Sequence, residues 1–145
     1  MADSTGTTNW YDQVSERLGD GGIDIDNDTF VWLLTDSNHV PASSDSGESD
    51  IDNELSGNGY SRYTVTGLTW NRSGAISTLD FNNPTFSASD GDLTARNWHM
   101  LDTTADLLFA WGLLDDTPDD VVTTDGNTLT ANIDASGFAT LGPSA

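Results

Sequence analysis

Between Ile23 and Leu141 the chain alternates short apolar stretches with turn-forming residues, a pattern typical of β-strands joined by tight connections. The stretch at 30–34 (FVWLL) is apolar throughout, as expected of a strand that is buried on both faces. The expected strands are 23–26, 30–34, 60–66, 76–81, 93–101, 107–114, 129–133 and 138–141. Their spacing of about 8 to 12 residues predicts an all-β protein, built as an antiparallel β-sandwich or jelly roll.

Residues 9–18 differ, because their apolar side chains recur every fourth position and so predict a short helix. The residues on its apolar face are Trp10, Val14 and Leu18. Asn9 stands where an N-cap belongs, and Gly19 stands where the helix should end. A helix of this length is unstable alone, so its apolar face must dock on something. A further single helical turn is expected around residues 51–55.

This predicted helix supplies the candidate partner-binding surface. Its residues are Trp10, Tyr11, Val14 and Leu18. The alternative is that the helix only covers one end of its own domain, with no partner involved. We divide the chain into an N-terminal arm with the short helix, residues 1–22, and a β-sandwich domain, residues 23–145.

The charge of the chain favours a protein that works in concentrated salt. It carries 24 acidic residues against four basic ones, a net charge of −20, and all four cations are arginines. Such self-repulsion opposes a compact fold in dilute buffer, whereas at molar salt the Debye length shrinks to about 3 Å. An ordinary acidic protein would usually contain some lysine, and a disordered chain would lack the aromatic residues present here. We therefore interpret the protein as halophilic and exclude nucleic acid as a partner.

The sequence contains no cysteine, no apolar run of transmembrane length, and no basic or apolar region at its start that is typical of a signal peptide. We expect the chain to be made and folded in the cytoplasm without binding a membrane. If it acts outside the cell, it must leave by another route, and release of virus particles is one such route.

Catalysis is not expected. His39 and His99 are the two histidines available for proton transfer near neutral pH. No nucleophile elbow, phosphate-binding loop or HExxH motif accompanies them. The sequence therefore predicts a protein that is not an enzyme and that needs no cofactor.

Three aspartates form a candidate for a weak metal site. Asp24, Asp26 and Asp28 have the DxDxD spacing that begins a calcium-binding loop. Thr29 and Thr35 then stand where that loop requires glycine and glutamate. On a strand the three aspartates would simply form one solvated face. The acidic clusters at 90–92 and 115–120 allow the same two interpretations, and weak cation binding in strong brine is expected at all of them.

The order of several motifs resembles a family of small virion proteins from tailed bacteriophages and archaeal tailed viruses. The motifs are FVWLLTDSNHVP, DNELSGNGYSR, FNNPTFSASDGDLTARNWHML, LLFAWGLLDDT and VVTTDGNTLTANIDASGFATL. The resemblance implies a β-sandwich or jelly-roll structural protein without catalytic residues. For a chain of this charge, our leading hypothesis is a capsid decoration or turret protein on the virion surface of a haloarchaeal tailed virus. Such a protein would bind the major capsid protein, or other virion proteins, as a symmetric homo-oligomer.

Two alternatives remain open at this point. The protein could be a tail or baseplate adaptor of the same virion, since the resemblance does not place it on the particle. It could also be a carbohydrate-binding domain of a halophile, with a row of exposed tryptophans as the sugar-binding surface.

The net charge of −20 predicts that the stability and size of the protein depend on salt. Dialysis from molar to about 0.1 M salt should dissociate the oligomer or unfold it, because screening of the acidic surface is lost. Thermal melting combined with size-exclusion chromatography across this range would measure the effect. Unchanged stability and unchanged size would contradict the halophilic interpretation.

Overall fold

The computed structural model describes residues 8–115, 117 and 119–143. Its strands are β1 Asn9–Trp10, β2 Phe30–Thr35, β3 Tyr63–Thr64, β4 Thr69–Ser73, β5 Ile76–Asp80, β6 Thr85–Ser87, β7 Leu93–Ala95, β8 Asn97–Asp102, β9 Leu107–Leu113, β10 Val121–Thr123, β11 Thr128–Thr130 and β12 Ala139–Leu141. Its helices are α1 Val14–Asp20 and the 3₁₀ turn η1 Glu48–Asp50. The strands pair in antiparallel fashion, so the predicted all-β class is confirmed.

The centre of the fold is a five-stranded sheet in the order β1-β9-β8-β2-β3. Strands β2 and β8 pair over six residues, from Phe30 opposite Asp102 to Thr35 opposite Asn97. Every residue of both strands is buried. The predicted two-sided burial of residues 30–34 is therefore confirmed, and the same burial extends to β8.

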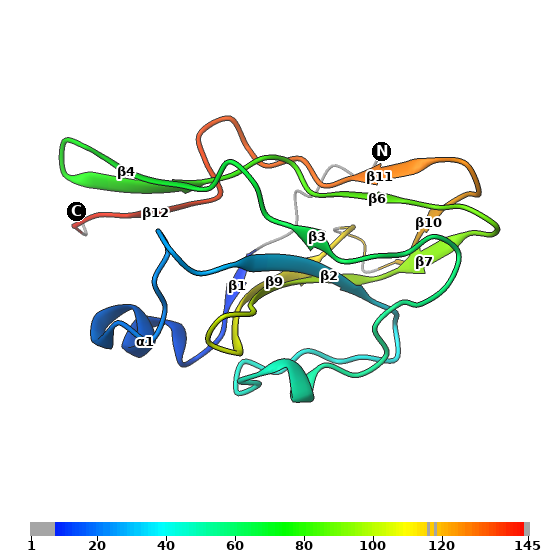
Figure 1. Cartoon of the computed structure of the whole chain (residues 1–145), viewed down its shortest axis with the longest axis horizontal. Coiled ribbons are helices and arrows are strands. Elements are labelled where there is room, and N and C mark those ends of the chain that lie inside the picture. The colour runs from blue at the N-terminus through cyan, green and yellow to red at the C-terminus, as the bar shows by residue number, and fades with distance from the viewer. Residues whose placement is uncertain (1–7, 116, 118, 144–145) are drawn as a thin grey trace.

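The remaining strands form a three-stranded sheet, β12-β5-β4, and two ribbons, β6–β11 and β7–β10. Figure 1 shows β4, β12, β6 and β11 running along one side of the molecule, over β2, β9 and β1. Helix α1 and the long loop after β2 lie on the other side of the five-stranded sheet. The sheet centre is thus covered on both faces.

Aromatic rings fill the space between the five-stranded sheet and the strands above it. The indoles of Trp32 and Trp98 stack in parallel with their centroids 4.2 Å apart. Phe138 meets both indoles edge-on, at 6.3 and 5.9 Å. Such pairs add roughly 0.5–1.5 kcal/mol each to the stabilisation from their buried area. These contacts join β2 and β8 to the residue that precedes β12.

The N-terminal helix differs from the prediction for residues 9–18. Asn9 and Trp10 form strand β1, which pairs with Trp111 and Ala110 of β9, so Asn9 is not the helix cap. The helix begins at Val14, runs through Gly19, and ends at Gly21, whose left-handed φ of 79° suits glycine. The open edge of β9 offers backbone partners that a lone helical turn lacks, and this edge recruits the start of the segment.

Residues 8–22 are packed against the β-sheets rather than separate from them. Tyr11 and Val14 belong to the same buried core cluster as the strands. Residues 1–7 of the predicted arm lie outside the described residues.

The long loop between β2 and β3 is held by an ion-pair cluster. Arg62 binds Glu54 and Glu48, each at 2.7 Å, and the Tyr60 hydroxyl donates to Glu54 at 2.8 Å. The Leu34 amide in turn donates to the Tyr60 oxygen at 3.1 Å, which ties the cluster to β2. A helical turn was predicted around residues 51–55. In the structure, the helical turn of this loop is η1, which ends just before residue 51.

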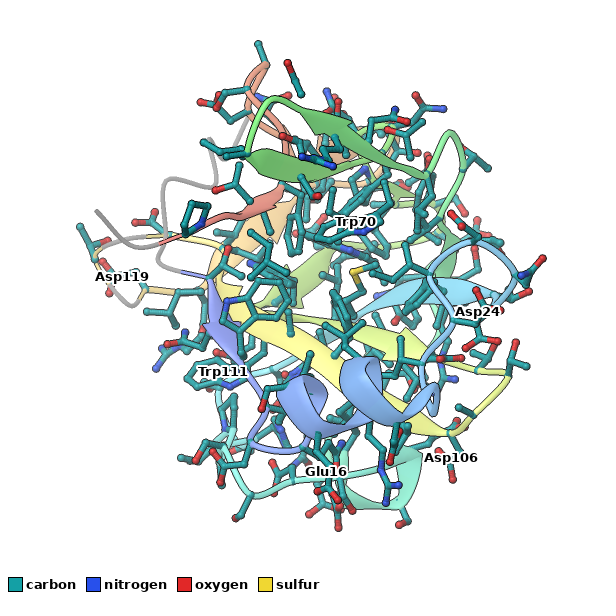
Figure 2. All side chains as sticks on the ribbon, turned by 90° about the vertical axis from the view of Figure 1, so that its left-hand side faces the viewer. Glu16, Asp24, Trp70, Asp106, Trp111 and Asp119 are labelled. Atoms are coloured by element: carbon teal, nitrogen blue, oxygen red, sulfur yellow. The ribbon has the colours of Figure 1, made fainter. Side chains whose placement is uncertain are left out.

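The acidic side chains lie mainly at the surface. Figure 2 shows Glu16, Asp24, Asp106 and Asp119 at the periphery of the molecule. Several aspartates accept hydrogen bonds from nearby loop amides and hydroxyls, and these bonds lower the pKa of Asp50, Asp115 and Asp134. The carboxylates thus fix loop conformations as well as hydrating the surface.

The packing around the indole stack predicts the effect of one added methyl group. A Cβ at Gly112 would lie only 2.8 Å from Nε1 of Trp98, which the stack holds in place. Gly112→Ala should therefore lower the free energy of unfolding by about 1–3 kcal/mol, the usual cost of overpacking.

The matched control is Gly19→Ala in α1, where nothing lies within 4 Å of the added Cβ. This change should raise stability by about 0.5–1 kcal/mol through helix propensity. Urea unfolding in molar salt measures both variants. Equal effects of the two changes would contradict the packing argument.

Candidate docking groove

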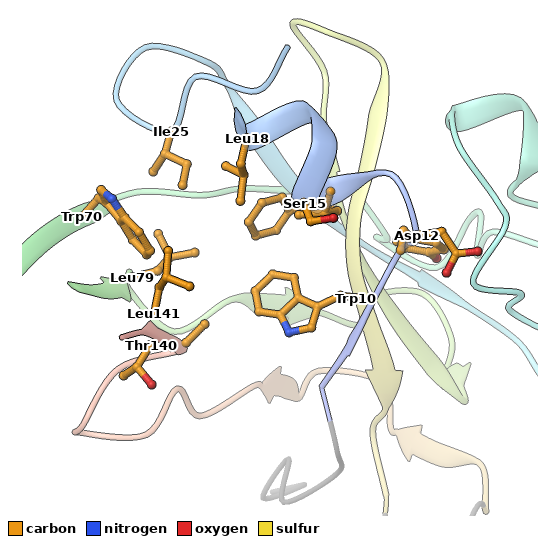
Figure 3. Close-up of a pocket in the computed structure, with 13 residues that line it drawn as sticks. Trp10, Asp12, Ser15, Leu18, Ile25, Trp70, Leu79, Thr140 and Leu141 are labelled. Carbon is orange, nitrogen blue, oxygen red and sulfur yellow. The ribbon is translucent and has the colours of Figure 1, made fainter. Parts of the chain in front are cut away.

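An open apolar groove of about 410 Å³ lies between α1 with β1 on one side and the β12-β5-β4 sheet on the other. Its walls carry far more apolar than polar side chains, and its polar contributors are Asp12, Ser15 and Thr140. Figure 3 shows the Trp70 ring pointing towards the space that Trp10 and Leu18 border from the other side. The groove therefore forms where four chain segments that are distant in the sequence meet, at residues 10–25, 70–79, 109 and 139–141.

All four residues predicted as the partner-binding surface line this groove, but they divide into two pairs. Trp10 and Leu18 are 43% and 37% exposed, so they are open to a partner. Tyr11 and Val14 are only 1% and 4% exposed and form part of the core. The segment thus covers its own domain and presents an apolar surface at the same time.

Trp10 is placed by aromatic contacts on its inner side. Its ring meets Phe109 edge-on at 5.1 Å and Phe138 edge-on at 6.1 Å. The rest of the indole borders the groove. The position of the Trp10 ring is therefore set by the chain's own core.

The opposite wall could not be inferred from the sequence. It consists of Trp70 from β4, Leu79 from β5, and Leu141 from β12. Leu141 is 63% exposed. These residues reach the groove because β5 pairs with both β4 and β12, and only the sheet order carries that information.

A second hollow of about 340 Å³ continues the groove past Leu18. Leu18, Ile25 and Trp70 line both spaces, and Asp24 with Asp26 borders the second. The apolar groove therefore ends at an acidic loop.

Beneath the groove, Tyr11 joins a buried polar network. Its hydroxyl lies 2.9 Å from Nδ1 of His99, and the Thr35 hydroxyl lies 3.0 Å from Nε2 of the same ring. Burial, together with the charges of Asp45 and Asp50, raises the pKa of Tyr11 far above its usual value. The ring of His39 stands 5.0 Å from that of His99, edge to face.

This environment makes His99 a structural residue. Its side chain is fully buried, and burial with the neighbouring His39 lowers its pKa to about 3. Both ring nitrogens have hydrogen-bond partners within the core. Neither histidine lines the groove.

The DxDxD segment forms a tight loop instead of the expected strand. Asp24 accepts from the Asp26 amide at 3.1 Å and from Nδ2 of Asn27 at 2.8 Å. Asp28 accepts from the Asp24 amide at 2.7 Å. Within residues 8–115, 117 and 119–143, no group of three or more carboxylate or imidazole side chains is gathered so that it could hold a metal ion.

The other acidic clusters also serve their own loops. Asp92 accepts from the Asp125 amide at 2.9 Å, and Asp115 with Asp119 accepts from Thr117. Asp116 of the predicted cluster at 115–120 lies outside the described residues.

Comparison with protein-family models, curated proteins and solved structures finds no match to this chain. No helix in the described part of the chain has the length and apolar character needed to cross a membrane.

The buried His99 predicts a specific pH dependence. Its pKa of about 3 in the folded state lies well below the value of about 6.5 in an unfolded chain, so the unfolded state binds more protons between these values. Stability supplied by the neutral ring is therefore complete above about pH 6.5 and is lost as the pH falls towards 3, by at most about 1.4 kcal/mol per pH unit.

The comparison to make is between the wild-type chain and His99→Gln. The difference between their free energies of unfolding should shrink as the pH is lowered from 7 to 4. Urea titrations at fixed molar salt measure the two free energies of unfolding. The pH dependence that the carboxylates contribute is common to both proteins and cancels in the difference. A difference that stays constant with pH would contradict the assigned role of His99.

Proposed function

We propose that this protein is a non-enzymatic structural component of a haloarchaeal tailed virus particle, a capsid decoration or turret protein that docks on the capsid surface. The observation that carries the proposal is the open apolar groove on a chain whose net charge is −20. The virion context comes from the order of the sequence motifs. The groove supplies the physical means of attachment.

The exposed apolar side chains of the groove are costly in the solvent that the composition implies. Concentrated salts that are excluded from protein surfaces strengthen the tendency of apolar area to be buried. Trp10, Leu18 and Leu141 remain open on a surface that is otherwise strongly acidic. A contiguous apolar patch of this kind marks an interaction site.

The lining of the groove defines the chemistry of the partner. It includes no cationic side chain, and the second hollow adds Asp24 and Asp26 at one end. An apolar segment with neutral or basic flanks would fit this surface, since a further acidic segment would be repelled. The major capsid protein, or another virion protein, would supply that segment and would meet the chain after both are made in the host cytoplasm.

The finer description of the fold as an antiparallel β-sandwich or jelly roll belongs to this proposal. It is supported by the aromatic core between the five-stranded sheet and the strands above it. Assembly as a symmetric homo-oligomer is supported by the edge strand β4, four of whose five residues are exposed.

A carbohydrate-binding domain is the second candidate, because the indoles of Trp10 and Trp70 both border the groove. Sugar binding needs several polar groups beside such rings to fix the hydroxyls. The few polar side chains of this groove favour an apolar protein segment instead. The tail-adaptor alternative uses the same groove and differs in the partner.

The docking proposal predicts that exposed groove residues control attachment. The double variant Leu18→Ser and Leu141→Ser should weaken binding to purified capsids at least tenfold, because it removes apolar area from both walls. Point variants are preferable to deletion of the N-terminal segment, since β1 pairs with β9 and Tyr11 is buried.

Co-sedimentation with capsids in molar salt measures the attachment. The matched control is Val40→Ser, which removes an apolar side chain that is 80% exposed outside the groove. It should leave binding unchanged. Equal binding by all variants would refute the groove as the attachment surface, and absence of the protein from purified virions would refute the virion assignment itself. Saturable quenching of tryptophan fluorescence by a sugar would favour the carbohydrate alternative.

A further inference from the structure

Asp102 stands apart from the other described acidic residues because its side chain is completely buried. It is the last residue of β8. Its Oδ1 accepts the amides of Thr104 and Ala105, at 2.9 and 3.0 Å. Its Oδ2 is equally buried and receives no hydrogen bond from the described residues. An anionic oxygen without a partner is costly in a protein interior.

The nearest charged group is a second carboxylate. Phe30 pairs with Asp102, and the ladder continues through the Thr103 amide, which donates to the Thr29 carbonyl at 2.9 Å. Asp28 lies in the loop two residues before Phe30, and its carboxyl group interacts directly with that of Asp102. Burial, the hydrogen bond that the two carboxyl groups make when one is protonated, and the charge of Asp28 together raise the pKa of Asp102 to about 6.

The protein supplies no cationic side chain to this pair. Arg17, Arg62 and Arg96 bind acids elsewhere, and Arg72 donates to the Gly74 carbonyl. The sequence contains no lysine, since Arg17, Arg62, Arg72 and Arg96 account for its four basic residues. The described side chains therefore leave the charge of these two adjacent carboxylates without a cationic partner.

We infer that Asp28 and Asp102 together bind a hydrated hard divalent cation, Mg²⁺ or Ca²⁺, with the Asp102 Oδ2 oxygen as the inner ligand. Mg²⁺ in proteins is often held by one or two carboxylates and keeps several of its waters. Ca²⁺ uses the same oxygen chemistry with a larger coordination shell. Asp28 is only half-buried, so a cation can enter from its side.

The DxDxD loop then has a role that differs from a calcium-binding loop. Asp24 donates its amide to Asp28 and accepts from Asp26 and Asn27, so it positions the ligand Asp28. Asp26 is exposed and takes no part in the pair. Ile25 of the same loop lines the groove, so the cation would also hold one edge of the groove in place.

The test uses the full chain at constant high ionic strength, so that general screening does not change during the titration. Calorimetric titration and thermal melting with MgCl₂ and, separately, CaCl₂ should show saturable binding and a melting temperature that rises with cation concentration. Asp102→Asn and Asp28→Asn should each weaken binding at least tenfold and abolish the rise. Asp26→Asn removes the same charge from the same loop and should behave as the wild-type chain.

Two results would overturn the inference. An equal response of the wild-type chain and Asp28→Asn, which alters a half-exposed residue and should fold, would place the cations elsewhere on the acidic surface. A wild-type stability that changes with pH near 6 but not with either cation would mean that the pair shares a proton only. A response to one of the two cations alone would support the inference and identify the ion.

Discussion

The pairing of β2 with β8 buries every side chain of both strands, and the other elements are arranged around the two faces of this pair. On one face the stacked indoles of Trp32 and Trp98 bind the upper strands through Phe138. On the other face His99 receives Tyr11 from the N-terminal segment. Since Tyr11 is flanked by Trp10 and Val14, this single hydrogen bond helps to place the floor of the groove. The groove is thus a consequence of how the central pair is covered.

The sequence could predict those elements whose signal is local. The continuous run at 30–34 indicated a strand buried on both faces, and the structure confirms it. Residues 9–18 were misassigned at their start, because Asn9 and Trp10 form a strand on the edge of β9, some 100 residues away in the sequence. Helical periodicity records only which side chains share a face. It carries no information about an open strand edge elsewhere in the chain.

The two walls of the groove also differ in how far the sequence could predict them. One wall was predictable, since Trp10 and Leu18 occur at helical spacing on an unusual N-terminal segment. The other wall was not, because Trp70 and Leu141 reach the groove only through the pairing of β5 with β4 and β12. Among the acidic residues, the DxDxD spacing predicted a weak metal site at Asp24, Asp26 and Asp28. The buried partner, Asp102, ends the fully buried strand β8, and its place beside the start of β2 is revealed only by the β2–β8 register.

The excess of acid has different consequences at the surface and in the interior. At the surface, carboxylates accept hydrogen bonds from loop hydroxyls and amides and keep their charge, as the lowered pKa values of Asp50 and Asp134 indicate. In the interior, the charge of Asp102 has no arginine to meet it, because the chain's four cations are engaged elsewhere. In the proposed cation site, this internal counter-charge comes from solution. If the protein works in brine, as we propose, concentrated salt would act on this fold in two ways, by screening the coat of carboxylates and by supplying the ion for the proposed Asp28–Asp102 site.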